Sequence, residues 1–160
     1  MNWESRVQKA WASATPESAE ERIKTIEQLA SEKPPNDPVA LFERASAQDS
    51  YGSEFEAEPL YKAAIAAGLS NVDPARNTQA FIQLASTLRN LGKLEEATAT
   101  LAEAEKLDVD LDQANWVRAF QLLCKLSMGE DITESKAELE ILSQLLTRYQ
   151  ASVTRFAKEF

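Results

Sequence analysis

Histidine is absent from this sequence, and cysteine occurs only once, at Cys124. The lack of histidine removes the commonest general base and the commonest metal ligand. A single cysteine excludes an intramolecular disulfide and a thiolate metal cluster. Cys124 lies in a strongly apolar stretch, so we expect a small buried core residue rather than a nucleophile. The sequence therefore predicts a protein that is not an enzyme and that has no metal and no cofactor.

Basic residues are also scarce, because 17 Lys and Arg stand against 26 Asp and Glu, a formal net charge of -9. A general nucleic-acid binder needs a surplus of basic groups to neutralise phosphates, so nucleic acid is excluded as a partner. No apolar run approaches the roughly 20 residues of a membrane span, and the first residues do not form a signal peptide. We therefore expect a cytoplasmic protein with no membrane partner.

Glycine and proline are few, with 4 and 6 occurrences, and they separate long stretches rich in Ala, Leu, Glu, Gln and Lys. These residues favour helices, and alternating runs typical of strands are absent. Asp37-Pro38 and Asp73-Pro74 each place a capping carboxylate before a proline that suits the first helical position. The sequence predicts an all-α fold with about eight helices, over residues 3–14, 17–33, 38–51, 54–67, 74–91, 94–107, 111–128 and 133–158. We expect an extended link over 68–73 and a break in the last helix near Thr147.

One acidic stretch deserves a separate interpretation because Asp108, Asp110 and Asp112 have the spacing that begins a calcium-binding loop. An EF-hand needs Gly at its sixth position and Glu at its twelfth, where this sequence has Gln113 and Ala119. We therefore interpret the stretch as a link between helices in which Asp110 caps the helix that follows.

Two segments, residues 51–57 (YGSEFEA) and 91–97 (LGKLEEA), superpose without a gap. Each is followed by a large side chain four residues on, Tyr61 or Leu101, and by an alanine three residues beyond, Ala64 or Ala104. This pattern resembles the tetratricopeptide (TPR) repeat, and in particular the short bacterial group-five TPR family. The resemblance implies a solenoid of antiparallel helix pairs that binds other proteins, as a scaffold or adaptor without chemistry of its own.

On this resemblance the chain is a single helical-repeat domain over residues 1–160. Residues 1–36 form an N-terminal capping helix pair, 38–70 repeat 1, 74–109 repeat 2, 110–146 a divergent repeat 3, and 147–160 a C-terminal cap. Capping helices are expected because the ends of a solenoid expose apolar faces. The apolar residues of these caps are Trp3, Val7 and Trp11, packing on Ile23, Ile26 and Leu29, and at the other end Leu139, Leu142, Leu145, Leu146, Tyr149, Val153 and Phe156.

The third repeat has two conceivable registers. Anchoring the repeat on Gly129 puts three polar residues, Arg118, Gln121 and Lys125, at core positions. A shift of two residues instead makes an apolar set the packing face, composed of Trp116, Ala119, Phe120 and Leu123. We favour the shifted register, which leaves the three polar residues as a narrow stripe on an otherwise apolar helix.

In the TPR fold the first helix of each pair lines a concave groove. The resemblance assigns these residues to the groove: Val39, Phe42, Ser46, Asp49, Gln79, Gln83, Ser86, Arg89, Asn90, Arg118, Gln121 and Lys125. Three are cations and several are amides, so our hypothesis is that the groove binds a peptide segment of a partner protein, one that carries carboxylates. A groove that is only solvated is the other interpretation.

A second function stays open beside peptide binding. Aromatic residues near the chain ends suit interfaces, so the protein is alternatively a structural module that self-associates as a homodimer. The residues that would form this contact are Trp3, Trp11, Tyr149, Phe156 and Phe160.

Overall fold

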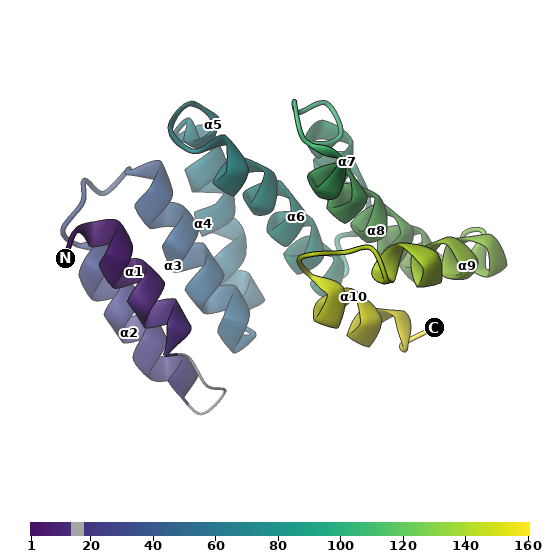
Figure 1. Cartoon of the computed structure of the whole chain (residues 1–160), viewed down its shortest axis with the longest axis horizontal. Coiled ribbons are helices and arrows are strands. Elements are labelled where there is room, and N and C mark those ends of the chain that lie inside the picture. The colour runs from purple at the N-terminus through teal and green to yellow at the C-terminus, as the bar shows by residue number, and fades with distance from the viewer. Residues whose placement is uncertain (14–17) are drawn as a thin grey trace. The chain divides into compact units, whose positions relative to one another are not determined.

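The computed structural model describes residues 1–13 and 18–160, and these residues form ten helices and no strand. The predicted all-α class is therefore confirmed. The helices in chain order are α1 (Trp3–Ala12), α2 (Ala19–Ala30), α3 (Pro38–Tyr51), α4 (Glu54–Ala66), α5 (Leu69–Val72), α6 (Pro74–Asn90), α7 (Leu94–Ala104), α8 (Leu111–Met128), α9 (Ile132–Ser143) and α10 (Gln150–Ala157) (Figure 1). The predicted helix end at 14 and helix start at 17 lie outside the described residues.

Two features raise the number of helices above the predicted eight. The link over residues 68–73 is not extended as predicted, because it contains the short helix α5, which buries Leu69 completely. The predicted break in the last helix is confirmed, since α9 ends at Ser143 and α10 begins at Gln150. Tyr149, just before α10, has a φ of 64° in the left-handed region, which interrupts the right-handed helical path.

The helix ends follow from local sequence. Asp37 accepts a hydrogen bond from the backbone amide of Ala40 at 2.9 Å and so caps α3. Asp110 caps α8 in the same way through Gln113, whose side chain bonds back to the Asp110 amide and completes a capping box. The interpretation of Asp110 as a cap is therefore confirmed. Gly52 ends α3 with a φ of 85°, a conformation that glycine adopts without steric cost.

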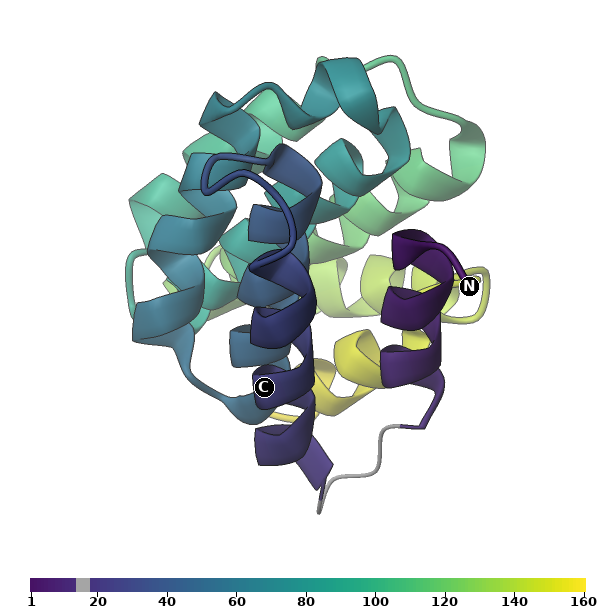
Figure 2. The ribbon, with the colours of Figure 1, turned by 90° about the vertical axis from the view of Figure 1, so that its left-hand side faces the viewer.

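The chain divides into two compact units, unit 1 over Met1–Gln83 and unit 2 over Leu84–Phe160. In unit 1 the antiparallel pair α1 and α2, nearest the viewer in Figure 2, packs beside α3 and α4. Their core contains Val7, Ile26, Leu29 and Ala47, with Trp3, Trp11 and Ile23 packed against it. The packing predicted for the N-terminal apolar stripe is confirmed. Small side chains let α3 and α4 approach closely, and the fully buried ones are Ala45, Ala57 and Ala64.

In unit 2, α8 contacts α7, α9 and α10, as expected for a helix that is apolar on most sides. The apolar residues predicted to form its packing face are all 9% exposed or less, namely Trp116, Ala119, Phe120 and Leu123. The residues that follow α8 divide into two groups. Leu139, Leu146, Val153 and Phe156 are buried as predicted, whereas Leu145 is 59% exposed, contrary to the prediction.

Candidate interaction surface

Helices α6 and α8 correspond from end to end. Asp73 accepts a hydrogen bond from the Arg76 backbone amide at 2.9 Å and caps α6, as Asp110 caps α8. Gly92 and Gly129 follow the two helices with the same φ of 75°. The two caps and the two glycines are each 37 positions apart in the sequence, so both helices share one register. Gly129 therefore corresponds to Gly92 at the helix ends, whereas the buried face of α8 is the apolar set that the shifted register predicted.

This common register brings polar residues of α6 into correspondence with mostly apolar residues of α8. The corresponding pairs are Gln79 and Trp116, Gln83 and Phe120, Ser86 and Leu123, and Asn90 and Ser127. The positions that are expected to face a ligand therefore carry three amides and a serine along α6, but three large apolar side chains and a serine along α8. We call the first set the α6 row and the second set the α8 row.

The buried hydroxyl of Tyr61 gathers three predicted groove residues in unit 1. It lies 2.7 Å from Gln83 Oε1 and 3.1 Å from Asp49 Oδ2. Ser46 donates a hydrogen bond to the same Gln83 oxygen at 3.1 Å. Because this oxygen accepts two hydrogen bonds, the Gln83 amide has one fixed orientation, with its Nε2 donors directed away from the cluster.

The other predicted groove residues of unit 1 are less alike. Phe42 is 4% exposed, and its ring centroid lies 6.2 Å from that of Tyr61, so it is a core residue of α3 and α4. Val39 and Gln79 are half-buried. The sequence did not predict that the Tyr61 hydroxyl bonds Gln83 of the α6 row. The repeat pattern calls for a large packing side chain at this position, and it gives no information about a hydroxyl group.

Arg89 is deeply buried in unit 2. Its guanidinium lies 4.2 Å from the ring centroid of Phe156 and donates to Ser127 Oγ at 3.2 Å. The carboxylate of Glu159 lies 3.4 Å away, and Asn90 Oδ1 accepts another hydrogen bond at 3.2 Å. The side chain of Arg89 is 6% exposed, so the cation faces this chain's own residues. Ser86 on the same helix is half-buried.

The three polar residues of α8 also face carboxylates of this chain. Arg118 holds Glu138 of α9 through two hydrogen bonds of 2.6 and 2.7 Å, which lower the pKa of that carboxyl. Lys125 lies 3.8 Å from Asp131, in the turn before α9. Gln121 reaches Glu105, just after α7, at 3.4 Å. The stripe therefore contacts residues of α9 and of the segments that flank α7 and α9.

The α8 row is covered by the residues that lead into α10. The ring of Tyr149 meets Trp116 and Phe120 edge to face, with centroid distances of 5.6 Å in both pairs. Val153 and Phe156 of α10 are 0% and 9% exposed. Aromatic spacing in the sequence identified these residues as a cap, but the register of α8 was needed to show which row they cover.

A tetratricopeptide repeat family model matches residues 38–160, which is more than three quarters of the chain. No curated protein and no solved structure matches the chain. The chain belongs to the tetratricopeptide repeat family. The group-five character inferred from the sequence agrees with this match.

The TPR match begins at α3, so the hairpin of α1 and α2 precedes the matched region. A charged network joins this hairpin to the first repeat within unit 1. Arg76 pairs with Glu43 of α3 at 2.9 Å, with its own cap Asp73 at 2.7 Å, and with Glu4 of α1. Trp11 of α1 donates to the second oxygen of Glu43 at 2.7 Å. Burial raises the pKa of Glu43, although both hydrogen-bond partners oppose that shift.

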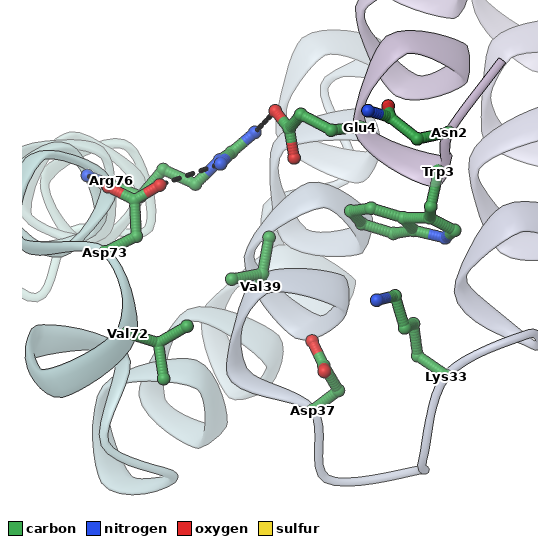
Figure 3. A pocket seen from close by; sticks show the side chains of 9 residues that line it. All are labelled: Asn2, Trp3, Glu4, Lys33, Asp37, Val39, Val72, Asp73 and Arg76. Atoms are coloured by element: carbon green, nitrogen blue, oxygen red, sulfur yellow. Dashed lines mark hydrogen bonds and ion pairs between the residues drawn. The ribbon is translucent and has the colours of Figure 1, made fainter.

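An open cavity of about 430 Å³ lies beside this network in unit 1 (Figure 3). Glu4 and Arg76 meet at one side of it, and the indole of Trp3 lies at another, with Lys33 Nζ 4.8 Å from the ring centroid. Val39 and Val72 supply apolar surface. The charged groups drawn there are largely engaged with each other or with helix ends, so this cavity has no set of convergent polar groups for a particular ligand.

Two observations concern groups that could take part in covalent or metal chemistry. Burial raises the pKa of the Cys124 thiol to about 11, so the thiol stays protonated near neutral pH. Within residues 1–13 and 18–160, no group of three or more His, Cys, Asp or Glu side chains is arranged to hold a metal ion. No helix in the same part of the chain has the length and apolarity that crossing a membrane requires.

Proposed function

We propose that this TPR protein is a non-catalytic interaction module that binds an extended peptide segment of a partner protein. TPR domains generally bind other proteins, which is the coarse function that the family supports. The finer proposal concerns the place and the chemistry of binding. In unit 1 the ligand would lie along Ser46, Gln79 and Gln83, on the first helices of the first two repeats.

The fixed amide of Gln83 is the observation that carries this proposal. Its carbonyl oxygen is occupied by Tyr61 and Ser46, so its Nε2 donors are oriented without any help from a ligand. A donor that is held in place before binding loses little conformational entropy when a peptide carbonyl accepts from it. An extended peptide offers such carbonyls along its backbone, independent of its side chains.

Recognition of carboxylates on the partner has less support than recognition of its backbone. The cations assigned to the groove are Arg89, Arg118 and Lys125. Each of them already lies close to a carboxylate of this chain, namely Glu159, Glu138 or Asp131. A partner's carboxylate would have to replace one of these groups, so the proposal depends on amides rather than on cations.

Self-association through the terminal aromatic residues has no comparable support. The Trp3 indole donates to the Leu29 carbonyl at 2.8 Å, and the Trp11 indole donates to Glu43. Phe156 packs against Arg89. These contacts within the chain account for the burial of the aromatic rings without a second copy.

The test is a selection of random extended peptides on the full chain, followed by fluorescence polarisation with the selected sequences. Gln83→Leu removes the oriented donors, and we expect it to weaken binding by about tenfold, the loss of one hydrogen bond to a peptide. Gln8→Leu, on the exposed side of α1, is the matched control and leaves binding unchanged. Equal affinity of the Gln83→Leu variant and the wild type would contradict the assignment of the site.

A further inference from the structure

The α8 row carries an occupant from its own chain. Tyr149 packs edge to face on Trp116 and Phe120, with 5.6 Å between centroids. Val153 and Phe156 follow four and seven residues after Tyr149. Val153 and Phe156 are three residues apart and share one side of α10, and Tyr149 precedes the helix and also contacts α8, an arrangement similar to an amphipathic helix docked in a groove.

The C-terminal end of this covering segment contacts Arg89, whose charge is opposite to that of Glu159. Arg89 stacks on Phe156 at 4.2 Å and pairs with Glu159 at 3.4 Å. The guanidinium of Arg155 lies 4.7 Å from the centroid of the same Phe156 ring. Arg89 therefore recognises an aromatic ring followed three residues later by a carboxylate. The docked pattern is an aromatic residue, an aliphatic residue, a second aromatic residue and an acid.

Several observations indicate that the occupant is held weakly. Helix α10 has only eight residues, and a helix of that length is unstable on its own. Val153 and Phe156 are its only buried residues. Tyr149 has a φ of 64°, a left-handed conformation that is uncommon for an aromatic residue. The contact with α8 therefore has to offset both the ordering of the helix and this backbone conformation.

The fit also leaves buried donors without acceptors. Trp116 Nε1 and Arg89 Nε are buried and have no hydrogen-bond partner among the described residues. Trp116 is 9% exposed and Arg89 is 8% exposed, so both side chains are more than nine-tenths enclosed. Such unpaired donors destabilise the arrangement in which residues 149–160 cover α8. A ligand with a suitably placed acceptor removes this cost.

We propose that the α8 row, with Arg89 at its end, is a second docking surface that receives an amphipathic helical segment of a partner protein. The partner's segment carries aromatic, aliphatic, aromatic and acidic residues spaced as Tyr149, Val153, Phe156 and Glu159. The chain's own residues 149–160 occupy this surface until the partner displaces them. This surface is separate from the row proposed for extended peptides, and its test does not use Gln83.

The experiment uses a fluorescein-labelled peptide with the sequence of residues 147–160 as its probe. The receptor is the full chain carrying Val153→Ser and Phe156→Ser, which weakens the chain's own occupant and leaves α8 unchanged. We expect saturable binding to this variant, at least about tenfold tighter than to the wild type, because the wild-type segment competes at a high effective concentration. A peptide with the substitutions Phe156→Ser and Glu159→Gln is the matched control and does not bind.

Arg89→Gln in the same receptor should lower the affinity for the intact peptide, whereas the control peptide should bind neither receptor. A receptor that keeps its helical circular dichroism and binds neither peptide would overturn the proposal. Formation of a dimer by the wild type, detected by sedimentation and lost in the Val153→Ser/Phe156→Ser variant, would identify a second copy as the occupant and would also overturn it.

Hydrogen exchange of the wild type keeps the proposal testable if the receptor variant does not fold. A displaceable segment opens locally, so the amides of α10 should exchange at least about a hundredfold faster than those of α8. Equal protection of the two helices would show that α10 opens only when α8 unfolds. The segment would then be a permanent part of the fold, and no partner could replace it.

Discussion

Helices α6 and α8 have matching caps and nearly equal lengths, 17 and 18 residues, but the rows that they present differ in chemistry. The α6 row has Gln79, Gln83 and Ser86, whereas the α8 row has Trp116, Phe120 and Leu123. The backbone register is the same in both. Side chains alone distinguish the polar row of α6, which is half-buried at Gln79, Gln83 and Ser86, from the apolar row of α8, which another part of the chain covers.

The difference shows how each kind of row is stabilised. Polar side chains such as Gln83 are satisfied by hydrogen bonds from Tyr61 and Ser46, and no further segment has to cover them. Large apolar side chains gain about 25 cal/mol for each Å² of apolar surface that leaves water. The α8 row therefore favours a covering segment, and residues 149–157 supply one.

Substitution of the corresponding aromatic and amide residues gives the largest expected contrast between the rows. Phe120→Ala removes a ring that is 3% exposed, and we expect the free energy of unfolding of unit 2 to fall by about 3 to 5 kcal/mol. Gln83→Ala, at the corresponding position of α6, should cost about 1 kcal/mol. Urea denaturation followed by circular dichroism measures both. Equal losses of unfolding free energy in the two variants would show that the α8 row does not depend on apolar burial more than the α6 row does.

Alkaline pH should destabilise unit 2 through a group on α8. Burial raises the pKa of Cys124 from its ordinary 9.0 to about 11, so the folded state keeps a thiol proton that the unfolded chain releases. The thiol therefore has no effect on stability below about pH 8, and stability falls as pH rises from about 9 to 11. The loss is about 2 to 3 kcal/mol, at 1.36 kcal/mol for each pKa unit. Denaturation of Cys124→Ala over the same range should lack this decrease, and an identical decrease in both proteins would assign it to other groups.

Local sequence signals predicted most of the fold. The caps at Asp37 and Asp110, the turn at Gly52 and the apolar stripe of α1 depend on neighbouring residues or on helical spacing, and all of them lie where the sequence placed them. The helix α5 was missed because four residues are too few to give a helical pattern. Leu145 was predicted to be buried because spacing alone does not reveal on which side a short segment is covered.

For α8 the sequence predicted the packing face but not the correspondence of Gly129 with Gly92 at the helix ends, which affects the candidate site. Sequence reasoning disfavoured Gly129 as the anchor because that choice puts Arg118, Gln121 and Lys125 at core positions. It did not include the acidic groups that those residues meet, Glu138, Glu105 and Asp131, because such pairs join separate segments and have no fixed spacing. Charge pairing between helices therefore permits polar residues where the repeat pattern has apolar ones.

Removal of the Tyr61 hydroxyl tests how much its hydrogen bond to the α6 row stabilises the protein. Tyr61→Phe deletes the hydroxyl that lies 2.7 Å from Gln83 Oε1 and 3.1 Å from Asp49 Oδ2, and it leaves the buried ring in place. We expect the free energy of unfolding of unit 1 to fall by about 1 kcal/mol, the net value of one buried hydrogen bond. Tyr51→Phe is the matched control, because Tyr51 is 49% exposed and bonds Glu20 at the surface. A loss as large as that from Phe120→Ala would mean that the row depends on Tyr61 for packing rather than for hydrogen bonding.

The smallest expected effect concerns the polar stripe of α8. Arg118 and Glu138 have side chains 42% and 38% exposed, so water and salt screen their attraction. Arg118→Gln should lower the free energy of unfolding by less than about 1 kcal/mol, and the loss should shrink further in 1 M salt. The peptide of residues 147–160 should bind the Arg118→Gln receptor as tightly as the unaltered receptor, because it contacts the α8 row and not this stripe. A marked loss of peptide affinity in Arg118→Gln, with stability unchanged, would show that the peptide binds the polar stripe of α8 rather than the α8 row. The contrast drawn between the α6 row and the α8 row would then be wrong.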